Sequence, residues 1–233
     1  MNISPLRIEP SLILAAHPKK VVQKYADKGL RISGRKFDEQ RKMELRTFTD
    51  ILKNYSLVKC GNTIVLVWIR LEIAEKRLDG KGGYFIPTVT LPRMEKKLYS
   101  QQLEIANTCI EMIEKHIESW EIIDLNQLVI DSDKCWCLYA DIKILNDDGN
   151  MYACLWKGLM ECFKQTSIPI IKDNIVVHKG KPLTFQSVNI QKCVIVNNHI
   201  LTDPDKREED NCDYYTYKGY VNGNCVWNFG VLT

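Results

Sequence analysis

The sequence RISGRKFDEQR, residues Arg31–Arg41, places four basic residues and one glycine within eleven positions. It follows a stretch that ends at Gly29, where a glycine is well suited to terminate a helix. Positive charge beside a glycine permits three interpretations: a nucleic-acid contact, a cradle for a phosphate, or a solvated loop at a sheet edge. The rest of the sequence has to decide among them.

The charge around this segment stands out from the rest of the chain. The net charge is only +3 over 233 residues, so composition alone does not indicate a nucleic-acid partner. Between His17 and Arg46, however, there are ten basic and four acidic residues. Local positive charge of this density attracts phosphates through counterion release. A basic helix face followed by a loop would have the same composition, so both interpretations stay open.

The composition predicts a globular protein of a reducing compartment. Apolar residues make up 45% of the chain, which is enough for a sizeable core. No apolar run reaches the ~18 residues of a membrane span, and Pro5, Glu9 and Pro10 argue against a secretory signal. Nine cysteines occur at irregular spacings, mostly inside apolar runs. They are expected to be free thiols, which favours the cytosol or nucleus.

Periodicity and turn residues predict the order of the elements. A helix is expected over residues 10–29, and the clearest helix over Ser100–Trp120, where apolar residues recur at steps of three and four. The remaining expected elements are strands at Leu57–Cys60 and Ile64–Ile73, a glycine-rich mobile loop at Gly80–Gly83 before a short strand, a long strand from Lys134, an apolar helix from Met151, and hairpins around Asn197-Asn198 and Asn222-Gly223. This order predicts a single α+β domain with mostly antiparallel pairing.

Few residues form a recognisable reactive group. Gly80–Gly83 lacks the strand-to-helix context of a phosphate-binding loop. The four histidines lie in different elements, and His116 is expected at the surface or its boundary. The close pair Cys135 and Cys137 lacks further zinc ligands. The acidic run Thr202–Asp213 could hold Mg²⁺ against a phosphate, although a charged loop between hairpins is the more common explanation.

Taken in order, these segments resemble the ribonuclease PH-like domain of the eukaryotic RNA exosome. The resemblance covers about residues 15–232 and is to the non-catalytic, OIP2-like (exosome component eight) type of ring subunit. It rests on Arg31, Gly34 and Arg35 of the opening turn, Gly61-Asn62-Thr63, Leu138–Asp141 with Asp148–Asn150, and Asp203-Pro204 with Glu208-Glu209. In this context Gly34 is expected to permit a bend, and the arginines to tie the first helix to the sheet.

The resemblance implies a fold and a setting. The fold is ribosomal protein S5 domain 2-like, with mixed, mostly antiparallel sheets and packed helices. Residues 1–29 would be an N-terminal helical extension, and residues 30–233 the domain, without the usual C-terminal helix. The implied partners are other exosome ring subunits, cap proteins and RNA, with no membrane and no cofactor. The implied role is in rRNA processing and RNA decay in the nucleus, nucleolus and cytoplasm.

Active members of this family bind phosphate at the start of the central helix through backbone donors and an arginine. Here the matching stretch is Gly149-Asn150-Met151-Tyr152, and the thioether of Met151 offers a phosphate nothing. Active members also carry two aspartates six positions apart. Within the acidic run Thr202–Asp213, only Asp203 and Glu209 are two acids at that spacing, and Asp203 lies too early. The resemblance therefore implies a subunit that is not itself an enzyme.

A channel-lining subunit would need positive charge without base readout, because the RNA must slide. The channel-facing loop of the family corresponds to LPRMEKKLYS, so Arg93, Lys96 and Lys97 are the expected RNA-binding residues, with Arg35 as a further candidate. A solvated loop remains the alternative. Two other functions stay open: an active phosphate-dependent 3′–5′ exoribonuclease, and a stand-alone RNA-binding domain.

Overall fold

A computed structural model of the chain describes residues 15–49, 53–77, 80, 82–92, 99–172 and 175–232. It confirms the α+β class. The elements run α2 (Pro18–Asp27), β1 (Met43–Thr49), β2 (Lys53–Cys60), β3 (Thr63–Glu75), β4 (Tyr84–Thr90), α3 (Tyr99–Ser119), the 3₁₀ helix η2 (Leu125–Leu128), β5 (Lys134–Asn146), α4 (Met151–Gln165), β6 (Ser167–Lys172), β7 (Ile175–Pro182), β8 (Val188–Val196), β9 (His199–Thr202), α5 (Lys206–Asp210), β10 (Tyr214–Val221) and β11 (Asn224–Leu232).

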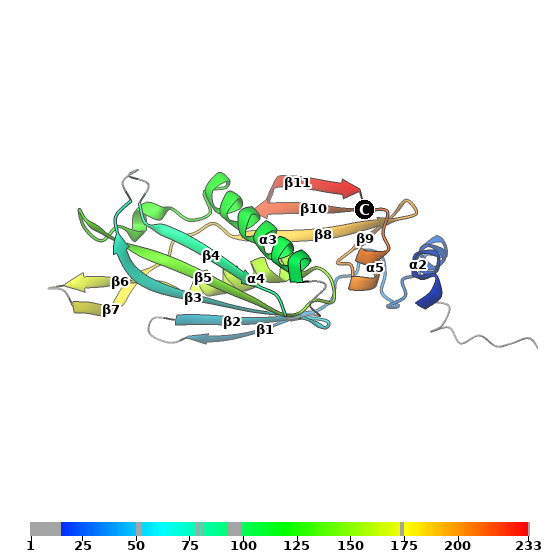
Figure 1. The fold of residues 1–233 in the computed structure, drawn as a ribbon, viewed down its shortest axis with the longest axis horizontal. Coiled ribbons are helices and arrows are strands. Elements are labelled where there is room, and N and C mark those ends of the chain that lie inside the picture. Colours follow the sequence, from blue (N-terminus) through cyan, green and yellow to red (C-terminus); the bar gives the residue numbers. More distant parts are fainter. Residues whose placement is uncertain are drawn as a thin grey trace, which may run out of the picture.

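Two sheets enclose a layer of helices, as Figure 1 shows. The first sheet has the order β1-β2-β3-β5-β4, in which β4 and β5 are parallel and the other described pairs antiparallel. The second sheet has the order β11-β10-β8-β9, and β6 and β7 form a separate hairpin. Antiparallel pairing therefore dominates, as the sequence predicts. Among the described residues, no helix is long and apolar enough to cross a membrane.

Helix α4 is the centre of the core. It packs against β2 and β3 of the first sheet and against β8 of the second. Trp156 and Phe163 are its largest fully buried side chains. A helix that is apolar on all sides needs cover on all sides, and the two sheets provide it. The prediction for this helix is confirmed.

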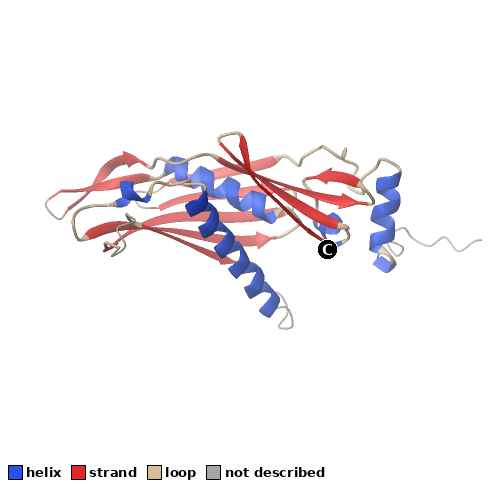
Figure 2. Cartoon of the chain, turned by 90° about the horizontal axis from the view of Figure 1, so that it is seen from above, coloured by secondary structure: helices blue, strands red, loops and turns tan. Residues whose placement is uncertain are grey.

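Helix α3 lies beside α4 and packs against β4 (Figure 2). Its buried side includes Ile113 and Ile117. His116 belongs to the same side and is only 4% exposed, so the expectation of a surface histidine was wrong. Its ring stacks on Trp120 with centroids 4.0 Å apart, and Nδ1 lies 3.1 Å from the Tyr152 hydroxyl. His116 is therefore a core residue that packs against aromatic side chains.

Both predicted hairpins are confirmed. Asn197 and Asn198 have positive φ, as do Asn222 and Gly223, which is the conformation that two-residue hairpin turns require. Part of the aromatic surface of the last hairpin packs against the core. The ring of Trp227 lies edge-on to that of His116, with centroids 4.6 Å apart. Seven of the nine cysteines are buried, and all are free thiols.

Other expectations need correction. Of the helix expected over residues 10–29, residues 15–16 and 18–27 are helical, with a break at His17, and residues 10–14 lie outside the described residues. Gly83 is packed against η2 rather than in an open loop, because an added Cβ would lie 2.5 Å from the Leu128 Cβ atom. The sequence did not predict β1 or the β6–β7 hairpin. The acidic run contains α5, with Asp205 and Glu208 forming a reciprocal capping box.

Acid sensitivity is expected from His116. Burial, with a smaller effect of Lys115, lowers the pKa of His116 to about 4, whereas an unfolded histidine titrates near ~6.5. The unfolded chain therefore binds a proton that the folded chain excludes, so stability falls as the pH drops from about 6.5 to about 4. His116→Phe keeps a ring against Trp120 and should flatten the dependence of melting temperature on pH in this range.

The control for this measurement is Tyr152→Phe. It removes the hydroxyl partner of His116 but keeps the titrating imidazole, so the pH slope should stay that of the wild type. Identical slopes for the wild type and His116→Phe would contradict the assignment.

Candidate functional site: a buried ion-pair cluster around Asp203

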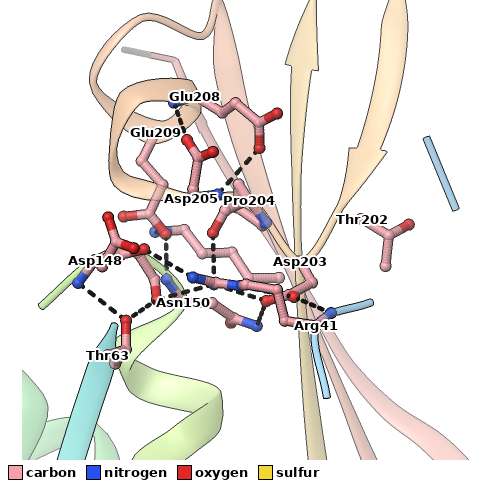
Figure 3. Close-up of polar contacts among 12 residues, drawn as sticks. Arg41, Thr63, Asp148, Asn150, Thr202, Asp203, Pro204, Asp205, Glu208 and Glu209 are labelled. Carbon is pink, nitrogen blue, oxygen red and sulfur yellow. Dashed lines mark hydrogen bonds and ion pairs between the residues drawn. The ribbon is translucent and has the colours of Figure 1, made fainter. Parts of the chain in front are cut away.

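Three segments that are distant in the sequence meet at Asp203 (Figure 3). They are the opening segment Arg31–Arg41, the turn before α4, and the connection from β9 to α5. Asp203 is 3% exposed and has a positive φ of 50°. A carboxylate this deeply buried has to be compensated by cations and hydrogen-bond donors.

Arg41 is the main partner of Asp203. Its guanidinium donates to both carboxylate oxygens, with Nη2–Oδ1 at 2.9 Å and Nε–Oδ2 at 3.0 Å. Its backbone N–H also donates to Oδ2 at 2.7 Å. The remaining donors reach the backbone carbonyls of Asp148, Gly149 and Pro204. Arg41 thus joins the opening segment to both of the other segments.

Arg31 forms a second buried pair, with Glu208 of α5. Nε lies 2.8 Å from Oε1, and the side chains are 0% and 1% exposed. Arg31 also donates to the backbone carbonyls of Thr202 and Asp203. Glu208 in turn accepts from the backbone N–H of Asp205 as part of the capping box. The pair therefore fixes α5 against the turn that contains Gly34, whose φ is +76°.

Arg35 completes the group of arginines. Its Nη1 lies 3.1 Å from Oδ2 of Asp203, and its Nη2 lies 3.8 Å from Glu208. The side chain is only 13% exposed. Burial first, and then the neighbouring Arg31, lower the pKa of Arg35. Its charge is directed toward the interior, so the predicted RNA contact through Arg35 is not supported by its position.

A carboxylate also occupies the start of α4. Asn150, the residue before the helix, has φ 56°. Its backbone N–H donates to Glu209 at 2.6 Å, and its side-chain amide donates to Asp203 at 2.7 Å. Lys192 of β8 pairs with Glu209 at 2.6 Å. A carboxylate of this chain therefore lies at the start of α4, where the helix N-terminus favours an anion.

Thr63 and Gly149 bring the backbones close enough for these contacts. The hydroxyl of Thr63 donates to the carbonyl of Gly149 at 2.7 Å and accepts from the N–H of Asp148 at 2.9 Å. Gly149 has φ +88°, and a Cβ atom there would lie 2.6 Å from the carbonyl oxygen of Pro204. Only glycine fits such an approach.

The cluster is thus a closed structural junction. Its carboxylates are taken up by arginine, lysine and backbone N–H groups, which leaves no free pair for Mg²⁺. Across the described part of the chain, no group of three or more His, Cys, Asp or Glu side chains could hold a metal ion. The sequence placed Arg31 and Arg35 correctly at the opening turn but missed the central role of Arg41 and the contribution of Lys192. Arg93, Lys96 and Lys97 lie outside the described residues.

Comparison with known proteins defines the family. Residues 39–169, more than half of the chain, match the model of the 3′ exoribonuclease family, domain 1. The chain belongs to this family. The match covers β1 through α4 and so includes the turn before α4 that Arg41 contacts.

Several curated relatives align with this member of the 3′ exoribonuclease family. Exosome complex component Rrp42 of Methanopyrus kandleri is 28% identical over 78% of this chain and 72% of the relative. Exosome complex component RRP45 of Saccharomyces cerevisiae is 28% identical over 78% and 62%. Exosome complex component rrp43 of Schizosaccharomyces pombe is 23% identical over 90% and 82%. A chain of the archaeal exosome core has the same fold, with TM-score 0.78, 24% identity and coverage of 96% and 88%.

Removing the central carboxylate should strongly destabilise the folded chain. Asp203→Asn leaves Arg41 buried without a counter-charge and leaves Arg35 with only Glu208 at 3.8 Å. The free energy of unfolding should therefore fall by about 3–5 kcal/mol in urea titrations. Burial alone would raise the pKa of Asp203, but hydrogen bonds from Arg41 and Asn150 outweigh it and hold the pKa below its usual value. The contribution of Asp203 is therefore complete above pH ~3.9 and is lost gradually as the pH falls from there through the lowered pKa of the folded chain.

Asp210→Asn is the matched control. Asp210 pairs with Lys206 on the surface of α5, with 56% of its side chain exposed. Its loss should change stability by less than about 1 kcal/mol. Equal effects of the two substitutions would show that the cluster does not support the fold.

Proposed function

We propose that this chain is a non-catalytic ring subunit of an RNA exosome. In this role it is a scaffold for a channel through which RNA reaches a separate 3′–5′ exoribonuclease. Three findings support the proposal: the family match, the relatives named as exosome components, and the fold shared with a chain of the archaeal exosome core. The observation that carries the non-catalytic part is the contact between Glu209 and the start of α4.

Phosphorolysis needs an anion site for the attacking phosphate, with fixed positive charge aimed at it. Active members provide it at the start of the central helix. In this chain Glu209 accepts the N–H of Asn150 there, and Met151 stands in place of an arginine. The nearby Arg31, Arg35 and Arg41 are engaged by Asp203 and Glu208. A phosphate would have to displace a carboxylate that Lys192 already neutralises, which argues against the active exoribonuclease alternative.

Among ring subunits, the OIP2-like type is the finer assignment. Its support is the opening-turn motif of the sequence and the rrp43 relative, which aligns over 90% of this chain. With this assignment we also propose a heterodimer partner of the ribonuclease PH-like kind and contacts with cap proteins. The proposed localisation is the nucleus, nucleolus and cytoplasm. The alternative of a stand-alone RNA-binding domain predicts that the chain ignores such partners.

Assembly and activity can be tested together. Co-expressed with the other ring subunits of its own exosome, the chain should elute with them in size-exclusion chromatography. The pure chain, given RNA and inorganic phosphate, should release no nucleoside diphosphates, because its anion site is filled. Phosphate-dependent release by the pure chain would contradict the non-catalytic assignment. A monomer that does not join the ring would instead favour the stand-alone domain.

The RNA-facing loop requires a separate test. Arg93→Glu, Lys96→Glu and Lys97→Glu in combination should weaken protection of RNA by the assembled ring, because each removes a phosphate contact. Log–log plots of affinity against salt should lose about 0.7 in slope per contact removed from a single strand. Charge reversal at the exposed Lys115, Lys134 and Lys218 is the control. Unchanged protection and an unchanged salt slope in the loop variant would contradict RNA binding by these three residues.

A further inference from the structure

The five-stranded sheet has one face against the helices and one face turned outward. Along β2, buried and less buried residues alternate, with Asn54, Ser56, Val58 and Cys60 buried. The intervening residues therefore belong to the outward face. Register between the strands then places the outward residues of β1, β3, β5 and β4 in rows that cross the sheet.

One of these rows is aromatic. Phe48 of β1 pairs with Tyr55 of β2, and Tyr55 pairs with Trp68 of β3. The rings of Tyr55 and Trp68 stack with centroids 6.5 Å apart and planes 29° apart. Phe48 is 61% exposed, the largest fraction among the exposed large apolar side chains. Three aromatic side chains thus occupy one row across adjacent strands, with Phe48 exposed and Tyr55 and Trp68 partly exposed.

Basic residues flank this row on both sides. Arg46 and Lys143 belong to the row on one side, and Lys53 and Arg70 to the row on the other. Arg70 pairs with both Asp141 and Glu72. Within the described part of the chain, no ion pair is found for the other three cations. Arg70 balances only one of these two carboxylates, and Glu44 lies on the same face opposite Lys59. With Arg46, Lys53, Lys59 and Lys143, the cations on this face still outnumber the acids.

We propose that this face binds single-stranded RNA, with bases stacked on Phe48, Tyr55 and Trp68 and phosphates near Arg46, Lys53 and Lys143. Stacking accepts any base, because every base has a π-face, and unpaired cations beside the rings supply the phosphate attraction. Lysine is depleted in protein–protein interfaces, whereas Lys53 and Lys143 lie directly beside this row. Chemistry and charge both favour a nucleic-acid strand.

This surface differs from the segment that contains Arg93, Lys96 and Lys97, and the proposal does not depend on ring assembly. The isolated full-length chain can therefore test it. The probe is a fluorescein-labelled oligoadenylate of about 12 nucleotides, within the site sizes of proteins that bind single strands. Anisotropy titrations should detect binding, and Phe48→Ala should weaken it about tenfold. The double variant Lys53→Glu and Lys143→Glu should weaken it at least as much and reduce its salt dependence.

Matched variants on the other sheet are the controls. Phe229→Ala on β11 removes an aromatic side chain that is 43% exposed, and Lys218→Glu reverses an exposed charge on β10. Both should bind RNA like the wild type. Trp68 supplies a second readout, because a stacked base should quench its fluorescence. In Trp68→Phe, which keeps an aromatic ring, most of the quenching should disappear while binding persists. Melting curves for every variant verify that the fold is retained.

Several results would overturn the proposal. One is wild-type affinity in Phe48→Ala and in the lysine double variant. Another is equal weakening by the control variants, which would indicate general charge attraction. A third is absence of RNA binding together with loss of co-purified ring subunits in Phe48→Ala, which would identify the face as a protein interface. In that last case the proposed ring function would stand and only the RNA face would fail.

Discussion

Burial of the Asp203 carboxylate is the constraint on which the arrangement of the chain depends. An uncompensated charge at 3% exposure is not tolerated, so the structure must bring Arg41, Arg35 and Asn150 to it. Those partners come from the opening segment and from the start of α4. Satisfying one carboxylate therefore fixes the position of the second sheet's β9–α5 connection relative to the helix that both sheets share. Buried ion pairs contribute little net stability, and their effect here is to select one arrangement.

The same constraint decides the chemistry of the cluster. Arginines near a helix N-terminus would ordinarily indicate an anion site. Here the chain supplies its own anions, since Glu208 binds Arg31 and Glu209 binds both Asn150 and Lys192. The arginine side chains of the opening segment, Arg31, Arg35 and Arg41, are thereby paired with carboxylates of the same chain. Of the three interpretations of that segment, the loop comes nearest, because most of its residues are exposed. The side chains of Arg31, Arg35 and Arg41 nevertheless pair with carboxylates of the cluster, so their charge serves the fold.

The sequence predicted those parts of the fold that local rules determine. Helix α3 follows from apolar spacing, and the two final hairpins follow from Asn197-Asn198 and Asn222-Gly223, whose residues tolerate positive φ. The cluster could be predicted only in part. Gly34 and its flanking arginines indicated a turn tied to the sheet, but the pairing of Arg41 with a carboxylate far along the chain has no local pattern. His116 was misplaced for a similar reason, because its cover comes from Trp120 and Trp227 together.

The distribution of charge explains why a net charge of +3 says so little about function. Some of the basic side chains, such as Arg31 and Arg41, are buried against carboxylates and cannot attract a distant phosphate. Others, such as Lys53 and Lys143, have no ion-pair partner among the described residues and lie on an open sheet face. Because both sheets use their inner faces to enclose α4, the outward-facing Lys53 and Lys143 stay exposed. What distinguishes an arginine paired inside the fold from an exposed lysine is therefore the register and layer in which each lies.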